Sequence, residues 1–429
     1  MISTLPYLAF ADKKGTVYSH PFLRMAVSDL SQFKLPTQEE LIRLPKGSAI
    51  FYLPGRTPIG FNPNTGNFEA LTTFEGKEVC AVAASLIPAY VRLYHPAAIL
   101  KQHYQLPLWA YTAAGCCGKN VYVTSRRIDI RTRHNPHFYD THVIREKINI
   151  LIKRYPQNRL IKHFAYCALN YNCLTARHLF LARGEAPVVA SRHCNASCLG
   201  CLSRRGSDCL SSHARINFIP NENEIIEVMK HHLRLAAEPI ISFGQGCEGE
   251  PLLEAERIAS AIKKVREQTA RGTINMNTNA SLPKKIELLC RAGIDSFRVS
   301  LNSPRQHFYQ LYFRPRRYSF KDVLSSIAIA KKYRKFVSVN LFVFPGFSDT
   351  AEEIKALKLF IKNTGIDMIQ WRNLNIDPAY YAQKLFPHSS KPLGVSQLLK
   401  TITDTFPYLK MGYFNLPKEQ FASFRNVIK

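Results

Sequence analysis

Residues 188–205, VVASRHCNASCLGCLSRR, join a short apolar strand to a loop that contains three cysteines. Val188–Ser191 is the predicted strand, and Cys194, Cys198 and Cys201 follow it with the spacing C-x3-C-x2-C. Clustered thiolates are soft ligands that suit zinc or an iron–sulfur cluster. The stretch therefore predicts a metal-binding loop at the carboxyl end of a strand, and the spacing alone leaves the metal open.

Beyond this loop, short apolar runs alternate with amphipathic helical patterns to about residue 375. Six successive βα units predict parallel strands joined by right-handed crossovers, hence an α/β fold with an open or closed barrel. A doubly wound sheet stays open as an alternative, because periodicity does not separate the two. The five further predicted strands are Ile240–Gly244, Thr273–Thr278, Phe297–Leu301, Val337–Phe344 and Met368–Arg372.

The metal site has two readings that differ in how coordination is completed. A structural zinc ion takes four protein ligands, and Cys209 or His193 could supply the fourth. A cluster held by three cysteines instead leaves one iron free to bind a substrate or cofactor. The second arrangement is the one that a reactive centre needs.

The cysteine spacing, directly after the first strand, resembles the signature of the radical S-adenosylmethionine (radical SAM) superfamily. The segment CNASCLGC matches that signature at every cysteine. The resemblance covers about residues 186–375. Within the superfamily, the chain is similar to a functionally uncharacterised branch with an N-terminal extension. It implies a partial (β/α)6 TIM-like barrel with an N-terminal α+β extension, and a 4Fe-4S cluster on Cys194, Cys198 and Cys201.

Two further segments resemble the family's SAM-binding positions. The second strand runs into GQGCEGEPLL, which is similar to the family's Gly-Gly-Glu-Pro segment, with Gly249 and Glu250 in place and Glu248 at the usual first glycine. The third strand ends in NTNAS, which is similar to a Thr-Asn-Gly turn, with Asn279 in place and Ala280 where glycine is common. The resemblance implies that Glu250 meets the amino group of SAM, and opposite charges in a partly dry site attract strongly.

The fourth strand, SFRVSLNS, carries polar residues at alternate positions. Alternation puts Arg298, Ser300 and Asn302 on one face. Three polar groups that point into a barrel are costly without a partner, so a bound polar cofactor explains them better than a packed core. The resemblance implies contacts with the carboxylate and ribose of SAM. At the end of the fifth strand, Pro345 and Gly346 allow close backbone approach, either to adenine or in a simple turn.

The resemblance also implies a reaction. A radical SAM enzyme cleaves SAM reductively to a 5′-deoxyadenosyl radical, which abstracts hydrogen from a substrate. A flavodoxin- or ferredoxin-like protein is the expected electron donor. The sequence identifies no further catalytic residue.

Charge bears on the substrate. The chain has 58 Lys and Arg against 31 Asp and Glu, a net charge of +27, and residues 101–200 alone carry 15 against 4. Such an excess favours an anionic partner, and RNA modification is the favoured hypothesis. A peptide or a small metabolite stays open as a substrate. A competing hypothesis from another class is a zinc-stabilised nucleic-acid-binding protein without catalysis.

Cysteine usage and hydropathy bear on the compartment. Eleven irregularly spaced cysteines do not suit a secreted disulfide scaffold, so we expect a reducing cytoplasm. The apolar run Ala81–Leu100 is interrupted by Pro88, Arg92 and Pro96, which favours buried helices over a membrane span. Outside the motif, no ligand spacing is recognisable at Cys116, Cys117, Cys167 or Cys173, and a second metal site at these cysteines stays open.

The chain is divided into four predicted segments. Residues 1–80 form a small β-rich module, in which NPNTG at 62–66 looks like a turn between strands. Residues 81–185 are predicted to be basic and mainly helical, 186–375 to form the barrel, and 376–429 to form a helical or irregular extension.

Overall fold

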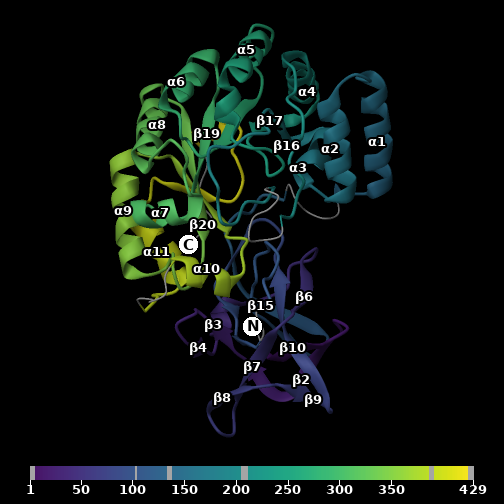
Figure 1. Cartoon of the computed structure of the whole chain (residues 1–429), viewed down its shortest axis with the longest axis vertical. Helices are drawn as coiled ribbons and strands as arrows, with labels where there is room; N and C mark the ends of the chain where they lie inside the picture. The colour runs from purple at the N-terminus through teal and green to yellow at the C-terminus, as the bar shows by residue number, and fades with distance from the viewer. Residues whose placement is uncertain (1–4, 102–103, 133–137, 204–210, 386–390, 424–429) are drawn as a thin grey trace.

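The structure is a computed structural model, in which two regions are apparent (Figure 1). An antiparallel N-terminal sheet lies at the bottom of the view, and a curled sheet of parallel strands with helices on its outside lies above it. Cys209, one of the candidate zinc ligands, falls outside the described residues. The structure describes residues 5–101, 104–132, 138–203, 211–385 and 391–423.

The parallel sheet confirms the predicted partial barrel. Its strands pair in chain order, and helical segments lie between successive strands, so the sheet curls into a half-barrel and does not reverse as a doubly wound sheet would. The strands are β16 (Arg183–Pro187), β17 (Ala237–Phe243), β18 (Thr273–Thr278), β19 (Ser296–Leu301), β20 (Phe336–Val343), β21 (Met368–Asn373) and β22 (Lys410–Gly412).

Two strands differ from the prediction. The first strand ends at Pro187, and Val188–Ser191 continue past the ladder, where Val188 N still donates to Ser242 O at 3.0 Å. The apolar residues after Pro187 are buried because they lead into the cysteine loop, while the ladder itself uses the polar run before them. The seventh strand, Lys410–Gly412, was missed because three residues are too short to show a strand pattern.

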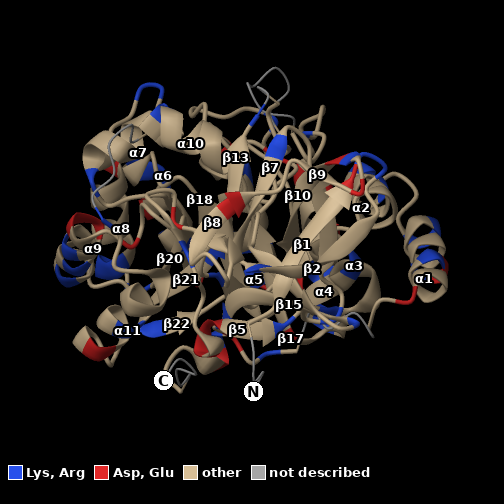
Figure 2. Ribbon diagram, turned by 90° about the horizontal axis from the view of Figure 1, so that it is seen from below, with Lys and Arg blue, Asp and Glu red and all other residues tan. Residues whose placement is uncertain are grey.

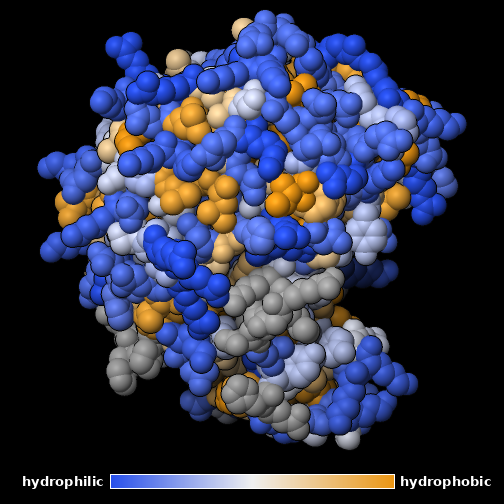
Figure 3. Space-filling model, turned by 45° about the horizontal axis from the view of Figure 1, so that its top comes forward, coloured by the Kyte–Doolittle hydropathy of each residue, from blue (hydrophilic) through white to orange (hydrophobic). Residues whose placement is uncertain are grey.

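Helices cover the outer face of the parallel sheet (Figure 1). The buried apolar residues of these helices share one core with the strands, and the surface seen in Figure 3 is mostly hydrophilic, with apolar side chains in small separate groups. The inner face of the half-barrel is left for polar residues. The helices are α4 (Glu222–Leu235), α5 (Ala255–Arg266), α6 (Pro283–Ala292), α7 (Gln306–Phe313), α8 (Phe320–Lys332), α9 (Ala351–Thr364), α10 (Pro378–Leu385) and α11 (Val395–Thr405).

Three helices precede the barrel and pack beside its first strand. They are α1 (Thr141–Arg154), α2 (Arg159–Asn170) and α3 (Leu174–Leu181), and they share one continuous core with the barrel. The side chain of Asp140 accepts a hydrogen bond from His142 N and so caps α1, as the sequence predicts. Their place brings α2 close to the loops that follow β16 and β17.

The N-terminal sheet extends further along the chain than predicted. Strand β10 runs across residue 80, and strands continue to Arg127, so Ala81–Leu100 does not form helices. Ladder partners on both sides decide the conformation of this alanine-rich run, because packing against neighbouring strands outweighs local propensity.

The predicted turn at 62–66 is confirmed as the link between β7 and β8. The strands of this region are β1 (Tyr7–Asp12), β2 (Val17–Met25), β3 (Val27–Ser28), β4 (Phe33–Lys34), β5 (Leu41–Arg43), β6 (Ala49–Leu53), β7 (Arg56–Asn62), β8 (Asn67–Ala70), β9 (Thr73–Phe74), β10 (Lys77–Ser85), β11 (Tyr90–Arg92), β12 (His95–Pro96), β13 (Ala98–Leu100), β14 (Ala114–Cys117) and β15 (Asn120–Arg127).

The N-terminal sheet contacts the carboxyl edge of the barrel. Arg56 forms a buried ion pair of 2.7 Å with Asp377, and Arg92 N donates to Asn373 Oδ1 at 2.9 Å. Both barrel residues lie at or just beyond the end of β21. The carboxyl ends of barrel strands are where such folds carry their active sites, so the N-terminal sheet forms a wall on that side.

Gly346, at the end of β20, is approached closely by that wall. Its φ is +88°, and an added Cβ would overlap the carbonyl oxygen of Asp29. The close backbone approach expected at this glycine is therefore made by the N-terminal region of the same chain.

Candidate functional site

The cysteine loop lies at the carboxyl end of β16, and its backbone is fixed by α7 and the turn that follows it. Ser197 N donates to Phe313 O at 3.0 Å, and Leu199 N donates to Tyr312 O at 2.9 Å. Asn195 O accepts from Arg316 N at 2.8 Å. The loop is thus held in place independently of any ligand on its thiols.

The three thiols are partly buried, with Glu250 and Arg215 as charged neighbours. Burial, together with the negative charge of Glu250, raises the pKa of Cys194 to about 11, and burial raises that of Cys198 well above its usual value. Arg215 donates from Nη2 to Cys201 Sγ at 3.3 Å. The thiolates of Cys194 and Cys198 are therefore disfavoured unless further positive charge lies beside them, which a metal centre supplies.

Glu248, which stands where the family usually has glycine, joins the first two strands. One carboxylate oxygen accepts from Ala190 N and Ser191 N at 2.8 and 3.0 Å, and the other accepts from Gly244 N and Gln245 N at 2.6 and 3.0 Å. Burial raises the pKa of Glu248 to about 7, against these four amide donors, which favour the carboxylate. Glu248 therefore fixes the chain just before the cysteine loop, a role that the sequence analysis missed.

Gly249 lies against the backbone of the cysteine loop. Gly249 N donates to Ser191 O at 2.7 Å, and Glu250 N donates to His193 O at 2.8 Å. An added Cβ on Gly249 would overlap the carbonyl group of His193. Only glycine allows this approach, which sets the segment directly beside Cys194.

Glu250 and Asn279 meet beside the cysteines. Glu250 is 4% exposed, and burial raises its pKa to about 7. Its carboxylate accepts from Thr278 Oγ1, from Leu252 N at 3.1 Å and from Asn279 N at 2.9 Å. The side chain of Asn279 in turn donates to Asn195 Oδ1 at 2.8 Å, between the first two cysteines. The residues predicted on strands one to three therefore come together.

The residues predicted on the fourth strand lie in two different surroundings. Arg298 lies on the inner face and donates to Gln370 Oε1 at 3.2 Å, and burial lowers its pKa to about 9. Ser300 is half-buried at the next position on the same face. Asn302 is buried just beyond the strand and donates to Phe308 O at 3.1 Å, so its amide contacts the first turn of α7.

The inner face of the barrel holds polar atoms that lack hydrogen-bond partners within the described part of the chain. They are Arg298 Nε, Asn340 Oδ1 and Arg372 Nε, on three successive strands. A buried polar atom without a partner is costly, so this face fits a polar ligand. Asn340 was not predicted, although it alternates with apolar residues in the strand VSVNLFV.

A family match defines the class of this site. Residues 188–360 match the model described as the Radical SAM superfamily, a range that includes the cysteine loop and Glu250 and ends in α9. The chain thus contains a radical SAM domain, as its cysteine spacing predicts, and this domain supports an enzyme of that class. Enzymes of this superfamily use a 4Fe-4S cluster and cleave SAM by a radical mechanism.

Solved structures resemble the chain at low identity. The FeFe-hydrogenase maturase HydG from Carboxydothermus hydrogenoformans is 14% identical, with 63% of this chain and 69% of that chain covered and a TM-score of 0.39. For anSMEcpe with bound AdoMet the identity is 19%, the coverage 53% and 61%, and the TM-score 0.40. For Streptococcus suis SuiB bound to S-adenosylmethionine the values are 14%, 64%, 62% and 0.39. The match thus spans less than two thirds of the last two chains.

Two further comparisons complete the description. A search of curated proteins finds no significant match. In the described part of the chain, every helix is too short or too polar to cross a lipid bilayer.

Proposed function

We propose that Cys194, Cys198 and Cys201 bind the 4Fe-4S cluster of this enzyme and that SAM binds beside it. The observation that carries the proposal is the meeting of the cysteine loop with Glu250 at the carboxyl edge of β16–β18, linked through Asn279 and Asn195.

The SAM contacts are proposed residue by residue. The backbone of Gly249 and the carboxylate of Glu250 face the amino group, and Asn279 orients Glu250 by donating its backbone N–H. The guanidinium of Arg298 and the side chains of Ser300 and Asn302 serve the carboxylate and ribose. Two observations support this set: the unpartnered Nε of Arg298, and the buried carboxylate of Glu250, whose charge an ammonium partner would stabilise.

When bound, the cluster and SAM supply reductive cleavage and hydrogen abstraction from the substrate. The chain's own residues orient and enclose the site. Glu248 holds the two strand ends together, Gly249 allows the close approach, and the N-terminal sheet covers the edge at β21. Closing the site from that side excludes water from a reactive centre.

We further propose an anionic substrate, with RNA favoured. The support is the net charge of +27, together with arginines beside the cysteines and on the inner face, at positions 215 and 372. Lys and Arg lie on helices at both sides of the view, such as α1 and α9, interspersed with Asp and Glu (Figure 2). A flavodoxin- or ferredoxin-like donor and a cytoplasmic location belong to the same proposal, supported by the many free cysteines.

Metal analysis tests the proposal. Anaerobically purified protein should be brown, with about four iron and four sulfide per chain. Colourless protein with zinc on the loop cysteines would overturn it in favour of a zinc-stabilised binding protein.

Filter binding tests the substrate class. Binding to cellular RNA should weaken steeply as salt rises, because phosphate contacts release counterions. Affinity that is indifferent to salt would remove RNA and favour a peptide or a small metabolite.

A further inference from the structure

A second group of metal-ligating side chains lies outside the cysteine loop. His163 and Cys167 stand four residues apart on α2, so both project from the same face of that helix. Cys247 comes from the loop between β17 and η3 (Pro251–Glu254), 80 residues later in the chain. The ligand atoms of these three residues all lie within 4.8 Å of one another.

The spacing of these atoms suits one small ion. Cys167 Sγ lies 3.5 Å from His163 Nε2. With ordinary zinc–sulfur and zinc–nitrogen bond lengths and tetrahedral angles, two such ligands of one zinc ion stand about 3.5 Å apart. The protein already holds the pair at the distance that coordination requires.

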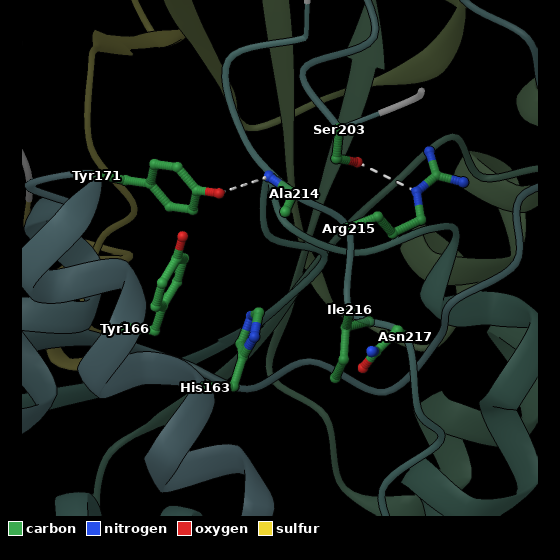
Figure 4. Close-up of a pocket in the computed structure, with 8 residues that line it drawn as sticks. All are labelled: His163, Tyr166, Tyr171, Ser203, Ala214, Arg215, Ile216 and Asn217. Carbon is green, nitrogen blue, oxygen red and sulfur yellow. Dashed lines mark hydrogen bonds between the residues drawn. The ribbon is translucent and has the colours of Figure 1, made fainter. Parts of the chain in front are cut away.

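The three residues differ in burial, and the side of the group that carries His163 is open to a pocket. Cys167 and Cys247 are 1% and 6% exposed, whereas His163 lines a pocket of about 600 Å³. Figure 4 shows the imidazole of His163 pointing into that pocket, below Tyr166 and Tyr171 and beside Ile216. The two thiols are thus buried outside the pocket lining, and the imidazole forms part of the pocket wall.

The opposite wall of the pocket is tied to both cysteine sites. Ile216 N donates to the carbonyl oxygen of Cys247 at 2.8 Å, and Ala214 N donates to Tyr171 Oη at 3.2 Å. Arg215, between them, reaches Cys201 of the cysteine loop. The pocket therefore lies between α2 and the loop that we propose for the cluster.

We propose that His163, Cys167 and Cys247 bind a zinc ion whose fourth coordination position faces this pocket. Two thiolates and an imidazole are ligands that zinc prefers, and three protein ligands leave one position for water or an anionic oxygen. The ion ties α2 to the loop that carries Glu248, Gly249 and Glu250. It stands apart from the iron site, and the proposal holds whether or not the loop cysteines bind iron.

Metal analysis of matched variants tests this site. Anaerobically purified protein, supplied with zinc and a thiol reductant, should retain about one zinc per chain against a competing chelator. Cys167→Ser, Cys247→Ser and His163→Asn should each weaken zinc retention at least tenfold. The control Cys290→Ser changes a buried cysteine on α6 and should keep the zinc. Iron content should be the same in the control and in His163→Asn, a variant of a half-exposed residue that leaves the thiols in place.

Zinc-edge X-ray absorption supplies a readout that does not depend on variant folding. The expected spectrum of the wild-type holoprotein contains two sulfur ligands at about 2.3 Å and nitrogen or oxygen ligands at about 2.0–2.1 Å. A spectrum with oxygen and nitrogen ligands only would overturn the proposal. Recovery of a Cys167–Cys247 disulfide from the reduced, zinc-supplied protein, or equal zinc in Cys167→Ser and wild type, would overturn it as well.

Discussion

The cysteine loop and the group of His163, Cys167 and Cys247 place sulfur ligands side by side in two different ways. The loop gathers its three cysteines within eight residues, so its spacing is visible in the sequence. The second group joins one face of α2 to a loop 80 residues away, and only the fold brings it together. A local motif can therefore be recognised from the sequence, whereas a site built from separate elements cannot.

Removing one loop cysteine should have the largest effect of the variants described below, and it should remove the metal of one site only. Cys198→Ala should lose the iron and sulfide, and with them all SAM cleavage, because three thiolates are needed to hold the cluster. Zinc at the second group should stay at the wild-type level. Metal analysis and an assay for 5′-deoxyadenosine check both outcomes, with Cys290→Ala as the control. Parallel loss of zinc in Cys198→Ala would mean that the two regions form one site.

Gly249→Ala should disturb the contact that lies between the two regions. The added methyl group would overlap the carbonyl of His193, so we expect a loss of about 1–3 kcal/mol in unfolding free energy and reduced iron loading. Chemical denaturation and iron content measure these effects.

The matched control for that variant is Gly246→Ala. There an added Cβ would make an ordinary contact of 3.4 Å with Leu202 Cδ1, and stability should change little. Equal stability of the two variants would show that the close approach at Gly249 does not matter.

Glu250→Gln should weaken the binding of SAM beside the cysteine loop and leave the second group of ligands unaffected. The amide keeps the shape of the side chain but loses the charge that faces the amino group of SAM, so SAM affinity should fall ~10- to 100-fold. Iron and zinc should both stay bound. Equilibrium SAM binding to the reconstituted protein measures this, with Glu254→Gln as the control. Unchanged affinity in Glu250→Gln would remove Glu250 from the proposed SAM contacts.

Ala280→Gly should have the smallest effect and should leave both metal sites intact. Ala280 has a φ of +55°, in the left-handed region that glycine adopts without steric cost. Part of the gain is offset by the greater freedom of glycine in the unfolded chain, so we expect stabilisation of about 0.5 kcal/mol. A loss of stability in denaturant titrations would contradict this account of the turn.

The same contrast between local and distant interactions explains how much of the fold could be predicted. Strands β17 to β21 were predicted to within a few residues, and β18 with identical bounds, because each is a short stretch with apolar residues between helical patterns. The strands at Ala81–Leu100 were mistaken for helices because their ladder partners lie far away in the chain.

The candidate site divides in the same way. Glu250 and Asn279 were predicted from local motifs, and the structure brings them together with the cysteine loop. The hydrogen bonds by which Glu248 joins two strand ends could not be predicted, and neither could the group of His163, Cys167 and Cys247. In both cases the partner residues come from separate elements.

The most direct test of the account is the fate of SAM. Reconstituted protein incubated anaerobically with SAM and dithionite, with and without cellular RNA, should form 5′-deoxyadenosine, while Cys198→Ala should form none. Absence of 5′-deoxyadenosine from brown, iron-loaded wild-type protein, or equal formation by Cys198→Ala, would contradict the assignment of the cluster to the loop at 194–201.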